Sequence, residues 1–250
     1  MWYPLIYIWM HTCTCHRAAN VPLLSNANRL RRARWVVRMA NWNWNRVCAS
    51  RPRVQSAQGF PVSAQVIFSD EKRFLVYGDR PLRVWRRQGQ RLQANFLRQR
   101  TQSRVGIMCW LALKSDGSSR LIRCPDKVDS LSYQRDILTP SLPFIRGSWF
   151  QQDNAPPHVS RSTLAWLAGK RVKVLPGWPA CSPDLNLVEH AWAAIARNLV
   201  NQRFTSADAL WHGIQGAWAA VQRPFVRSLW RSMPRRLQAV RKARGGATPY

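Results

Sequence analysis

The feature that most constrains the fold is the order of two kinds of pattern after residue 65. Short runs rich in Val, Ile, Phe and Trp come first, and similar runs then alternate with segments of helical spacing. This order predicts an α/β fold with a mixed central sheet flanked by helices. The expected strands are Val66–Phe68, Leu82–Trp85, Val105–Leu113, Arg120–Arg123, Trp149–Gln151 and Val172–Leu175. The expected helices are Ser130–Ile145, His158–Ala168, Asn186–Val200, Ser206–Val221 and Pro224–Lys242.

The chain divides into four parts by composition. Residues 28–46 mix arginines with apolar residues at helical spacing, which predicts a basic linker helix ending near the Asn/Trp cluster. Residues 47–65 show no periodicity and are interpreted as a linker or insertion. The main globular domain is expected at 66–250, and residues 1–27 are expected to form a tail outside it. In this tail the segment HTCTCH is an alternative zinc site, although its ligands are more crowded than in paired zinc knuckles.

The charge of the chain favours a polyanionic partner. Lys and Arg number 39 against 11 Asp and Glu, which gives a formal net charge of +28. Nucleic acid is favoured over an anionic membrane because no long apolar span accompanies this charge. The six cysteines have no repeated spacing, which argues against a disulfide framework.

Acids are scarce in this chain, so their positions are informative. Asp70 follows the apolar run VIFS and Asp153 follows GSWFQQ. Each is therefore expected near the carboxyl end of a strand, where open α/β sheets bind their ligands. Two structural alternatives remain open. Lys72 or Arg73 could neutralise Asp70 through a salt bridge, and Asp153 could cap backbone amides in a turn.

Glu189 lies near the start of an expected helix, and two interpretations of it remain open. It follows Asn186 by three residues, which is the spacing of a capping box. It also shares helical spacing with Trp192, Ala193 and Ala196, which would direct the carboxylate along the packed face toward the sheet.

Asp70, Asp153 and Glu189 together form a candidate set of carboxylates at one edge of the sheet. Mg²⁺ is typically held by a few carboxylates, water and substrate phosphate. Two such ions can clamp the attacking and leaving oxygens of a phosphoryl displacement. The three acids therefore predict metal-dependent chemistry on a phosphodiester, with nucleic acid as the substrate class.

Six segments resemble, in order, the signature blocks of the Tc/mariner superfamily of DDE transposases, in its Tc-type branch. The segments are FSDEKRF, VWRR, CWLALKSDGSSRL, FQQDNAPPH, VLPGWPACSPDLNLVEHAW and SMPRRLQAVRKARGGATPY. The resemblance runs from about Asn28 to Tyr250. It implies an RNase H-like fold and makes residues 66–250 the expected DDE catalytic domain.

The resemblance also implies roles for individual residues. It places the catalytic, metal-binding triad on Asp70, Asp153 and Glu189, with two Mg²⁺ or Mn²⁺ ions expected as cofactors. Asn154 and His158 also match the family motif. They are possible supporting or DNA-contacting residues, as is His190; helix entry and local hydrogen bonding are the alternative.

The implied reaction is cleavage at transposon ends by an activated water, followed by attack of the freed 3′-hydroxyl on target DNA. Double-stranded DNA, comprising transposon ends and target, is the implied partner. The same resemblance implies a homodimer and a nuclear location, with no membrane partner.

The chain departs from the family pattern at several points. The spacing between Asp153 and Glu189 is one residue longer than is usual in this branch, and Leu187 stands where the family usually has proline. Most of the paired helix-turn-helix region that recognises the terminal repeats is expected to be missing. Three hypotheses remain open: an N-terminally truncated transposase with a working metal site, a catalytically silent remnant that binds DNA nonspecifically, and an RNase H-like nuclease unrelated to transposition.

Overall fold

The computed structural model describes residues 24–40, 42, 44, 66–76, 105–200, 202–221 and 223–250. Three predictions lie wholly or largely outside these residues: the N-terminal tail with its HTCTCH segment, the linker at 47–65 and the strand at Leu82–Trp85. The remaining predicted elements can be compared with the structure.

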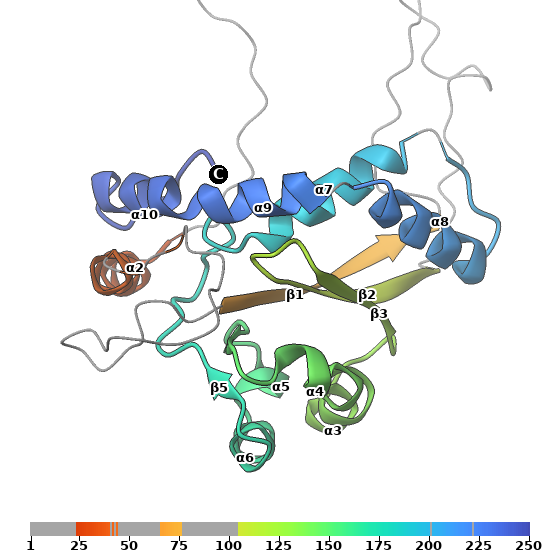
Figure 1. The fold of residues 1–250 in the computed structure, drawn as a ribbon, viewed down its shortest axis with the longest axis horizontal. Helices are drawn as coiled ribbons and strands as arrows, with labels where there is room; N and C mark the ends of the chain where they lie inside the picture. Colours follow the sequence, from red (N-terminus) through yellow and green to blue (C-terminus); the bar gives the residue numbers. More distant parts are fainter. Residues whose placement is uncertain are drawn as a thin grey trace, which may run out of the picture.

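A mixed sheet forms the centre of the described part of the chain, as predicted (Figure 1). The strand order is β3-β2-β1-β4-β5. The three strands β1, β2 and β3 pair antiparallel, whereas β4 pairs parallel with both β1 and β5. The strands are β1 (Val66–Leu75), β2 (Gly106–Leu113), β3 (Ser119–Cys124), β4 (Trp149–Gln151) and β5 (Lys173–Val174).

Helices cover both faces of this sheet (Figure 1). One face carries α2 (Asn26–Met39), α7 (Val188–Asn198), α8 (Ala207–Ala219), α9 (Arg223–Arg231) and α10 (Met233–Lys242). On the other side lie α3 (Ser130–Ser132), the π-helix η2 (Tyr133–Leu138), α4 (Thr139–Ile145), α5 (Pro156–Val159) and α6 (Arg161–Gly169). Among the described residues, no helix has the length and apolar character needed to cross a bilayer.

Several predicted bounds need correction. The strand predicted at Val66–Phe68 continues to Leu75, because β2 pairs with it as far as Gly106. The helix predicted at Ser130–Ile145 contains the π-helix η2, which lies just before two prolines that lack the N–H group of a regular helix. The helix predicted at His158–Ala168 is divided at Ser160 into α5 and α6. The helix predicted at Pro224–Lys242 is divided at Ser232 into α9 and α10.

The alternation of side chains along β1 creates two separate cores. Val66 and Phe68 pack in the core beneath α2 and α7–α10, whereas Ile67 packs in the core beneath α3, η2, α4 and α6. Neighbouring residues in a strand point to opposite faces, so β1 is buried on both sides. β2 follows the same rule, with Leu111 on the first side and Trp110 on the second.

The basic helix predicted at residues 28–46 forms α2, which ends at Met39, next to the Asn/Trp cluster. Its apolar residues Trp35, Val36 and Met39 belong to the same core as β1 and α7. Ser25 caps its first turn by accepting a hydrogen bond from the Asn28 amide (3.2 Å). The helix therefore packs as part of the domain core.

A buried arginine of α2 fastens the loop before α7 to the C-terminal tail. Arg32 is 1 % exposed and makes a bidentate pair with Asp184, with N···O distances of 2.8 and 2.6 Å. It also donates to the carbonyl oxygens of Cys181 (3.0 Å), Gly245 (2.9 Å) and Gly246 (3.1 Å). Gly245 has a φ of +79°, and a Cβ there would lie 1.9 Å from the Arg29 carbonyl oxygen, so only glycine fits. We call the contacts of Arg32 with Asp184, Cys181, Gly245 and Gly246 the Arg32 clamp.

Replacing Arg32 by methionine should lower the free energy of unfolding by about 3–5 kcal/mol, because it leaves the buried Asp184 carboxylate without its partner. Chemical denaturation of the full chain measures the change. Arg31→Met is the matched control, since Arg31 is exposed on the same helix and its loss should change stability by less than about 0.5 kcal/mol. Equal losses in the two variants would contradict the role of the clamp.

Candidate active site

Asp70 lies inside β1, not at its carboxyl end as predicted. The parallel pairing with β4 stops at Phe68 and Gln151, while the antiparallel pairing with β2 continues past Asp70, which faces Leu111. Asp70 therefore lies just beyond the point where β4 ends. Its side chain reaches the α7 side of the sheet, where Trp192 Nε1 donates to Asp70 Oδ2 at 3.0 Å.

Asp153 follows the end of β4 by two residues, and its side chain is half exposed. Its Oδ1 atom accepts hydrogen bonds from the Ala155 amide (2.8 Å) and from His158 Nδ1 (2.6 Å). The predicted turn role is therefore present. It uses only Oδ1, so it is compatible with a second role for Oδ2.

Glu189 lies in the first turn of α7, but the predicted packed face is offset by one residue. Val188, Ala191, Trp192 and Ile195 are buried, whereas Ala193 is exposed. Glu189 consequently lies at the edge of the packed face, partly accessible.

Asn186 lies just before Leu187, the N-cap of α7, and joins the start of this helix to β1 without forming the predicted capping box. Its Oδ1 atom accepts from the Val188 amide (3.1 Å), and its Nδ2 atom donates to the Ser69 carbonyl oxygen (3.2 Å). The side chain of Glu189 makes no hydrogen bond to the backbone of the described residues. The hydrogen bonds of Asn186 therefore leave the carboxylate of Glu189 available to a ligand.

The three acids line one cavity of about 310 Å³. Asn154, Ala155, Asn186 and the loop residues 178–183 complete its wall. Among the described residues, no lysine or arginine lines it. The Arg32 clamp anchors this loop through the Cys181 carbonyl oxygen. Arg38 donates to the Pro176 carbonyl oxygen just before the loop (2.8 Å). The cavity thus combines three carboxylates with a wall anchored to α2.

Burial and neighbouring carboxylates raise the pKa of Asp70 to about 8. After burial, the largest contributions come from Glu189 and Glu71, and the hydrogen bond from Trp192 opposes them only in part. The alternative that a basic neighbour neutralises Asp70 is not supported, since Arg73 pairs with Asp126 (3.4 Å) and no described side chain forms an ion pair with Asp70. Asp70 is therefore either protonated or in need of a cation.

The donor chemistry of the cavity fits a hard divalent cation. All three acids supply oxygen ligands, and the repulsion that raises the pKa of Asp70 would become attraction with a cation between them. Within the described ranges, no group of three or more His, Cys, Asp or Glu side chains is already close enough together to hold an ion. The ligand type fits, while the acids are spread around the cavity wall.

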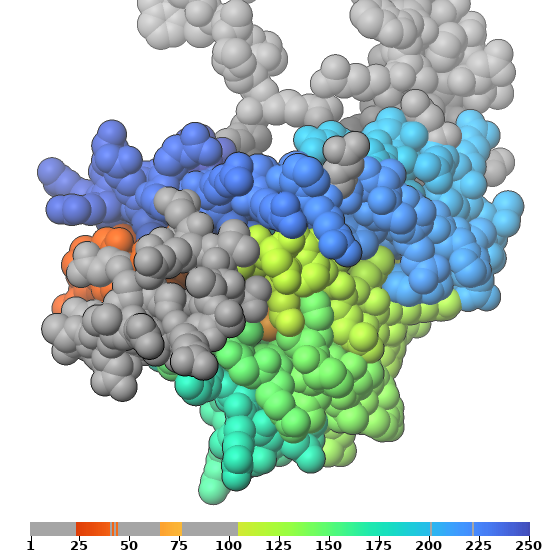
Figure 2. Space-filling model, in the orientation of Figure 1, coloured from red at the N-terminus to blue at the C-terminus, as the bar shows by residue number. Residues whose placement is uncertain are grey.

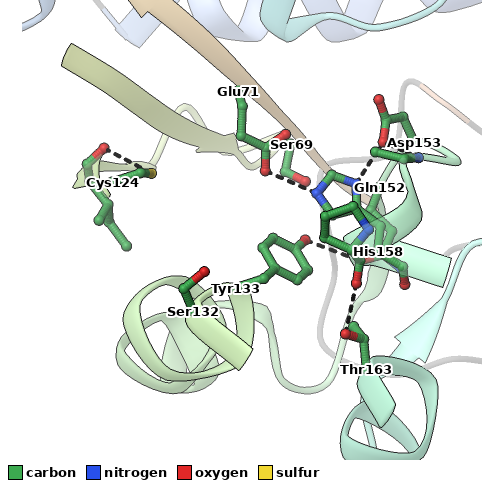
Figure 3. A network of polar contacts seen from close by, with 12 residues as sticks. Ser69, Glu71, Cys124, Ser132, Tyr133, Gln152, Asp153, His158 and Thr163 are labelled. Atoms are coloured by element: carbon green, nitrogen blue, oxygen red, sulfur yellow. Dashed lines mark hydrogen bonds and ion pairs between the residues drawn. The ribbon is translucent and has the colours of Figure 1, made fainter. Parts of the chain in front are cut away.

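His158 connects two acids on different elements (Figure 3). Its ring is buried, with Nδ1 2.6 Å from Asp153 Oδ1 and Nε2 3.2 Å from Glu71 Oε1. Burial alone would lower the pKa of His158, but its contacts with Asp153 and Glu71 raise it to about 10. Because both neighbours are carboxylates, both ring nitrogens act as donors. Burial opposes ionisation of Asp153, but the His158 and Ala155 hydrogen bonds hold its pKa below the usual value.

Sequence reasoning missed Glu71, Tyr133 and Gln152 in this network. The Tyr133 ring packs against His158 with ring centroids 4.3 Å apart and a tilt of 36° between the rings, and its hydroxyl donates to Gln152 Oε1 (3.1 Å). Gln152 Nε2 in turn donates to the His158 carbonyl oxygen (2.9 Å). One signal was present in the sequence, because Glu71 is one of only two glutamates and directly follows Asp70 on a strand.

Asn154 and His190, the other possible supporting residues, have different positions. Asn154 lines the cavity and donates from Nδ2 to the Trp178 carbonyl oxygen (2.9 Å). The His190 ring instead contacts Arg236 Nη2 at 3.1 and 3.3 Å and does not line the cavity. Burial and the arginines Arg236 and Arg197 lower the pKa of His190 to about 4. Only Asn154 and His158 therefore lie with the acids.

Comparison with known sequences finds a matching family model and a similar protein that spans most of the chain. Residues 65–211 match the family model described as DDE superfamily endonuclease. The Tc1 transposase of a transposable element from Caenorhabditis elegans is 32 % identical over 236 residues, which cover 92 % of this chain and 80 % of that protein.

Solved structures show the same fold. The Mos1 transposase paired-end complex with the left transposon end has a TM-score of 0.73 at 20 % identity, covering 96 % of this chain and 69 % of that one. The Mos1 transposase catalytic domain, solved with Raltegravir and Mn, has a TM-score of 0.63 at 20 % identity, with 90 % and 98 % covered. Its counterpart with Mg gives 0.62 at 19 % identity, covering 90 % of this chain and 99 % of that one. These likenesses confirm the predicted RNase H-like fold.

Without a divalent cation, the free energy of unfolding should fall as pH rises from about 4 to about 8. Over this range the folded chain keeps the Asp70 proton because its pKa is about 8, whereas the unfolded chain has lost it because the ordinary pKa of an aspartate is 3.8. Each pH unit then costs up to about 1.4 kcal/mol. Asp70→Asn should remove this part of the slope, because an amide does not titrate.

Denaturant unfolding in EDTA at a series of pH values measures both slopes. His158, whose pKa is raised to about 10, adds a further fall above about pH 6.5, but it does so in both proteins and cancels in their difference. Parallel curves of stability against pH for parent and variant would show that folding does not raise the pKa of Asp70.

Proposed function

The chain belongs to the DDE superfamily endonucleases, as a transposase related to Tc1, and from this we propose that it cuts DNA strands and joins them to a target. The observation that carries the proposal is the cavity lined by Asp70, Asp153 and Glu189. Asp70 lies on a strand, Asp153 just after a strand and Glu189 on a helix. The resemblance to the family motifs assigns the three triad positions to these acids. We assign them the catalytic and metal-binding roles.

We propose Mg²⁺ or Mn²⁺ as the cofactor, with two ions held by the three acids. The donor chemistry of the cavity supports this, as do the structures of the Mos1 catalytic domain with Mn and with Mg. Bound divalent ions would lower the pKa of a water nucleophile and stabilise the charge that develops on the phosphate. Asp70 must lose its proton to bind a cation, so affinity for the cation should increase as pH approaches 8.

The proposed reaction is a pair of in-line displacements at phosphorus. In the first, a water oxygen attacks the phosphodiester, and the bond to the 3′ oxygen breaks to leave a free 3′-hydroxyl and a 5′-phosphate. In the second, that 3′-hydroxyl attacks a phosphodiester of the target, forming a new bond and releasing the 3′-hydroxyl of the target. The acids remain free of covalent bonds to DNA throughout.

Double-stranded DNA, as transposon ends and target, is the proposed partner. The net charge of +28 supports it through attraction to phosphates. The Mos1 paired-end complex, which contains a transposon end, is a structure of the same fold. We further propose that two copies of the chain act together and that the reaction takes place in the nucleus.

A second function is favoured by one observation. Within the described residues the acids do not yet form a group close enough to hold an ion. A catalytically silent remnant that binds DNA nonspecifically through its charge would have the same fold and the same dependence of binding on salt. Only a metal-dependent activity separates the two functions.

The purified chain should nick supercoiled plasmid in Mn²⁺, and Asp153→Ala should reduce nicking to background while leaving DNA binding unchanged. The reason is that Asp153 supplies an oxygen ligand, whereas DNA binding depends on the basic surface. Gel analysis of plasmid topology measures the nicking, and circular dichroism shows whether the variant is folded.

Asp126→Asn is the matched control, because Asp126 is an exposed aspartate in a surface ion pair with Arg73, outside the acid cavity. It should nick like the parent. If the parent binds DNA but never nicks it, the silent remnant is the better description. Appearance of joined products with a second DNA would support strand transfer in addition to cleavage.

A further inference from the structure

Glu71 is a partly buried acid that the proposed reaction does not use. It follows Asp70 directly, so the alternation of β1 directs the two side chains to opposite faces of the sheet. Asp70 meets Trp192 of α7, whereas Glu71 meets His158 of α5 (Figure 3). Glu71 does not line the acid cavity. Its carboxylate is therefore excluded by geometry from the candidate ligand set.

The contact between Glu71 and His158 lies largely inside the protein. The side chains are 18 % and 5 % exposed, and Glu71 Oε1 lies 3.2 Å from His158 Nε2. This oxygen is buried and has no well-aligned hydrogen bond among the described residues, so His158 Nε2 is the polar group that faces it. Neither side chain can turn away without leaving a buried polar atom that faces no polar group.

The His158 ring is fixed on its remaining sides as well. The tilted ring of Tyr133 packs against it, and Gln152, which accepts a hydrogen bond from Tyr133, donates to the His158 carbonyl oxygen. The ring therefore has one orientation, with Nε2 toward Glu71 and Nδ1 toward Asp153 (Figure 3).

The other ring nitrogen of His158, Nδ1, contacts the carboxylate of Asp153. This side chain is half exposed, and the hydrogen bonds to its carboxylate from His158 and Ala155 both reach the same oxygen, Oδ1. Without His158, the amide of Ala155 would be the only described group holding the carboxylate in place. Fixing Oδ1 in this way leaves Oδ2 in one defined direction.

We propose that Glu71 is a positioning residue that acts through His158 to orient the carboxylate of Asp153 for cation binding. The inference rests on the proposed function, because it takes Asp153 as a ligand. Groups that hydrogen-bond to metal ligands orient them, and their removal typically lowers metal affinity by about 10–100-fold. A purely structural role for Glu71 would change stability and leave the cation affinity of the folded protein intact.

Titration of Mn²⁺ into the full chain, followed calorimetrically, tests this without any measurement of activity. Glu71→Ala and His158→Ala should each weaken Mn²⁺ binding by about 10–100-fold. Because Glu71 acts only through His158, the double variant should bind no more weakly than His158→Ala alone. Asp153→Asn should abolish binding at this site.

Glu71→Gln is the conservative variant, since its amide oxygen keeps an acceptor in the place of Glu71 Oε1, facing His158 Nε2. It should bind Mn²⁺ more tightly than Glu71→Ala and more weakly than the parent. If Glu71→Ala does not fold, as judged by thermal melting, the same cycle with His158→Ala is run on Glu71→Gln.

Three outcomes would overturn the proposal: unchanged affinity in the folded Glu71 variants, losses that add in the double variant, or a glutamine variant as weak as the alanine one. In each of these cases the proposed function survives if Asp153→Asn still abolishes binding. If Asp153→Asn binds Mn²⁺ like the parent, both the proposed function and the positioning role fail.

Discussion

The site depends on a single constraint, the two-residue period of β1 at the centre of the sheet. A strand buried on both faces must send each neighbouring side chain to the opposite core, so two consecutive acids cannot share one environment. Asp70 enters the layer with α7, and Glu71 enters the layer with α5 and Tyr133. The strand β4 ends beside these two acids, and Asp153 follows its end by two residues. Asp153 contacts both layers, because it lines the cavity with Asp70 and its carboxylate also contacts His158.

The buried charges of this domain are compensated in two different ways. Asp184 has a full partner in Arg32, whose bidentate pair and carbonyl contacts use the whole guanidinium group, and this makes a rigid anchor. Asp70 has no such partner among the described residues, and its burial together with the neighbouring Glu189 and Glu71 raises its pKa. Asp184 thus has a complete ion pair, whereas Asp70 has only the hydrogen bond from Trp192 and lines a cavity, which separates a structural acid from one suited to a ligand.

Much of the fold could be predicted from the sequence, because the strand runs and their bounding residues are local signals. The three acids were identified because each stands beside a strand or helix signal and matches a family motif. Glu71 was missed as a partner of His158, since the two are distant in sequence and only the pairing of β1 with β4 brings them together. The face of α7 was misplaced by one residue, because Ala193 counts as apolar although it is exposed.

The overall charge of the chain and the charge of the cavity act in opposite directions on DNA. Exposed arginines on α2, α9 and α10, such as Arg31, Arg227 and Arg235, attract phosphates over long range. On the proposed function, the three carboxylates of the cavity repel the phosphate that must approach them. On the proposed function, a divalent cation converts this local repulsion into attraction while leaving the surface field unchanged. Binding and cutting of DNA therefore rest on different residues, and loss of the cation site would remove cutting while DNA binding persists.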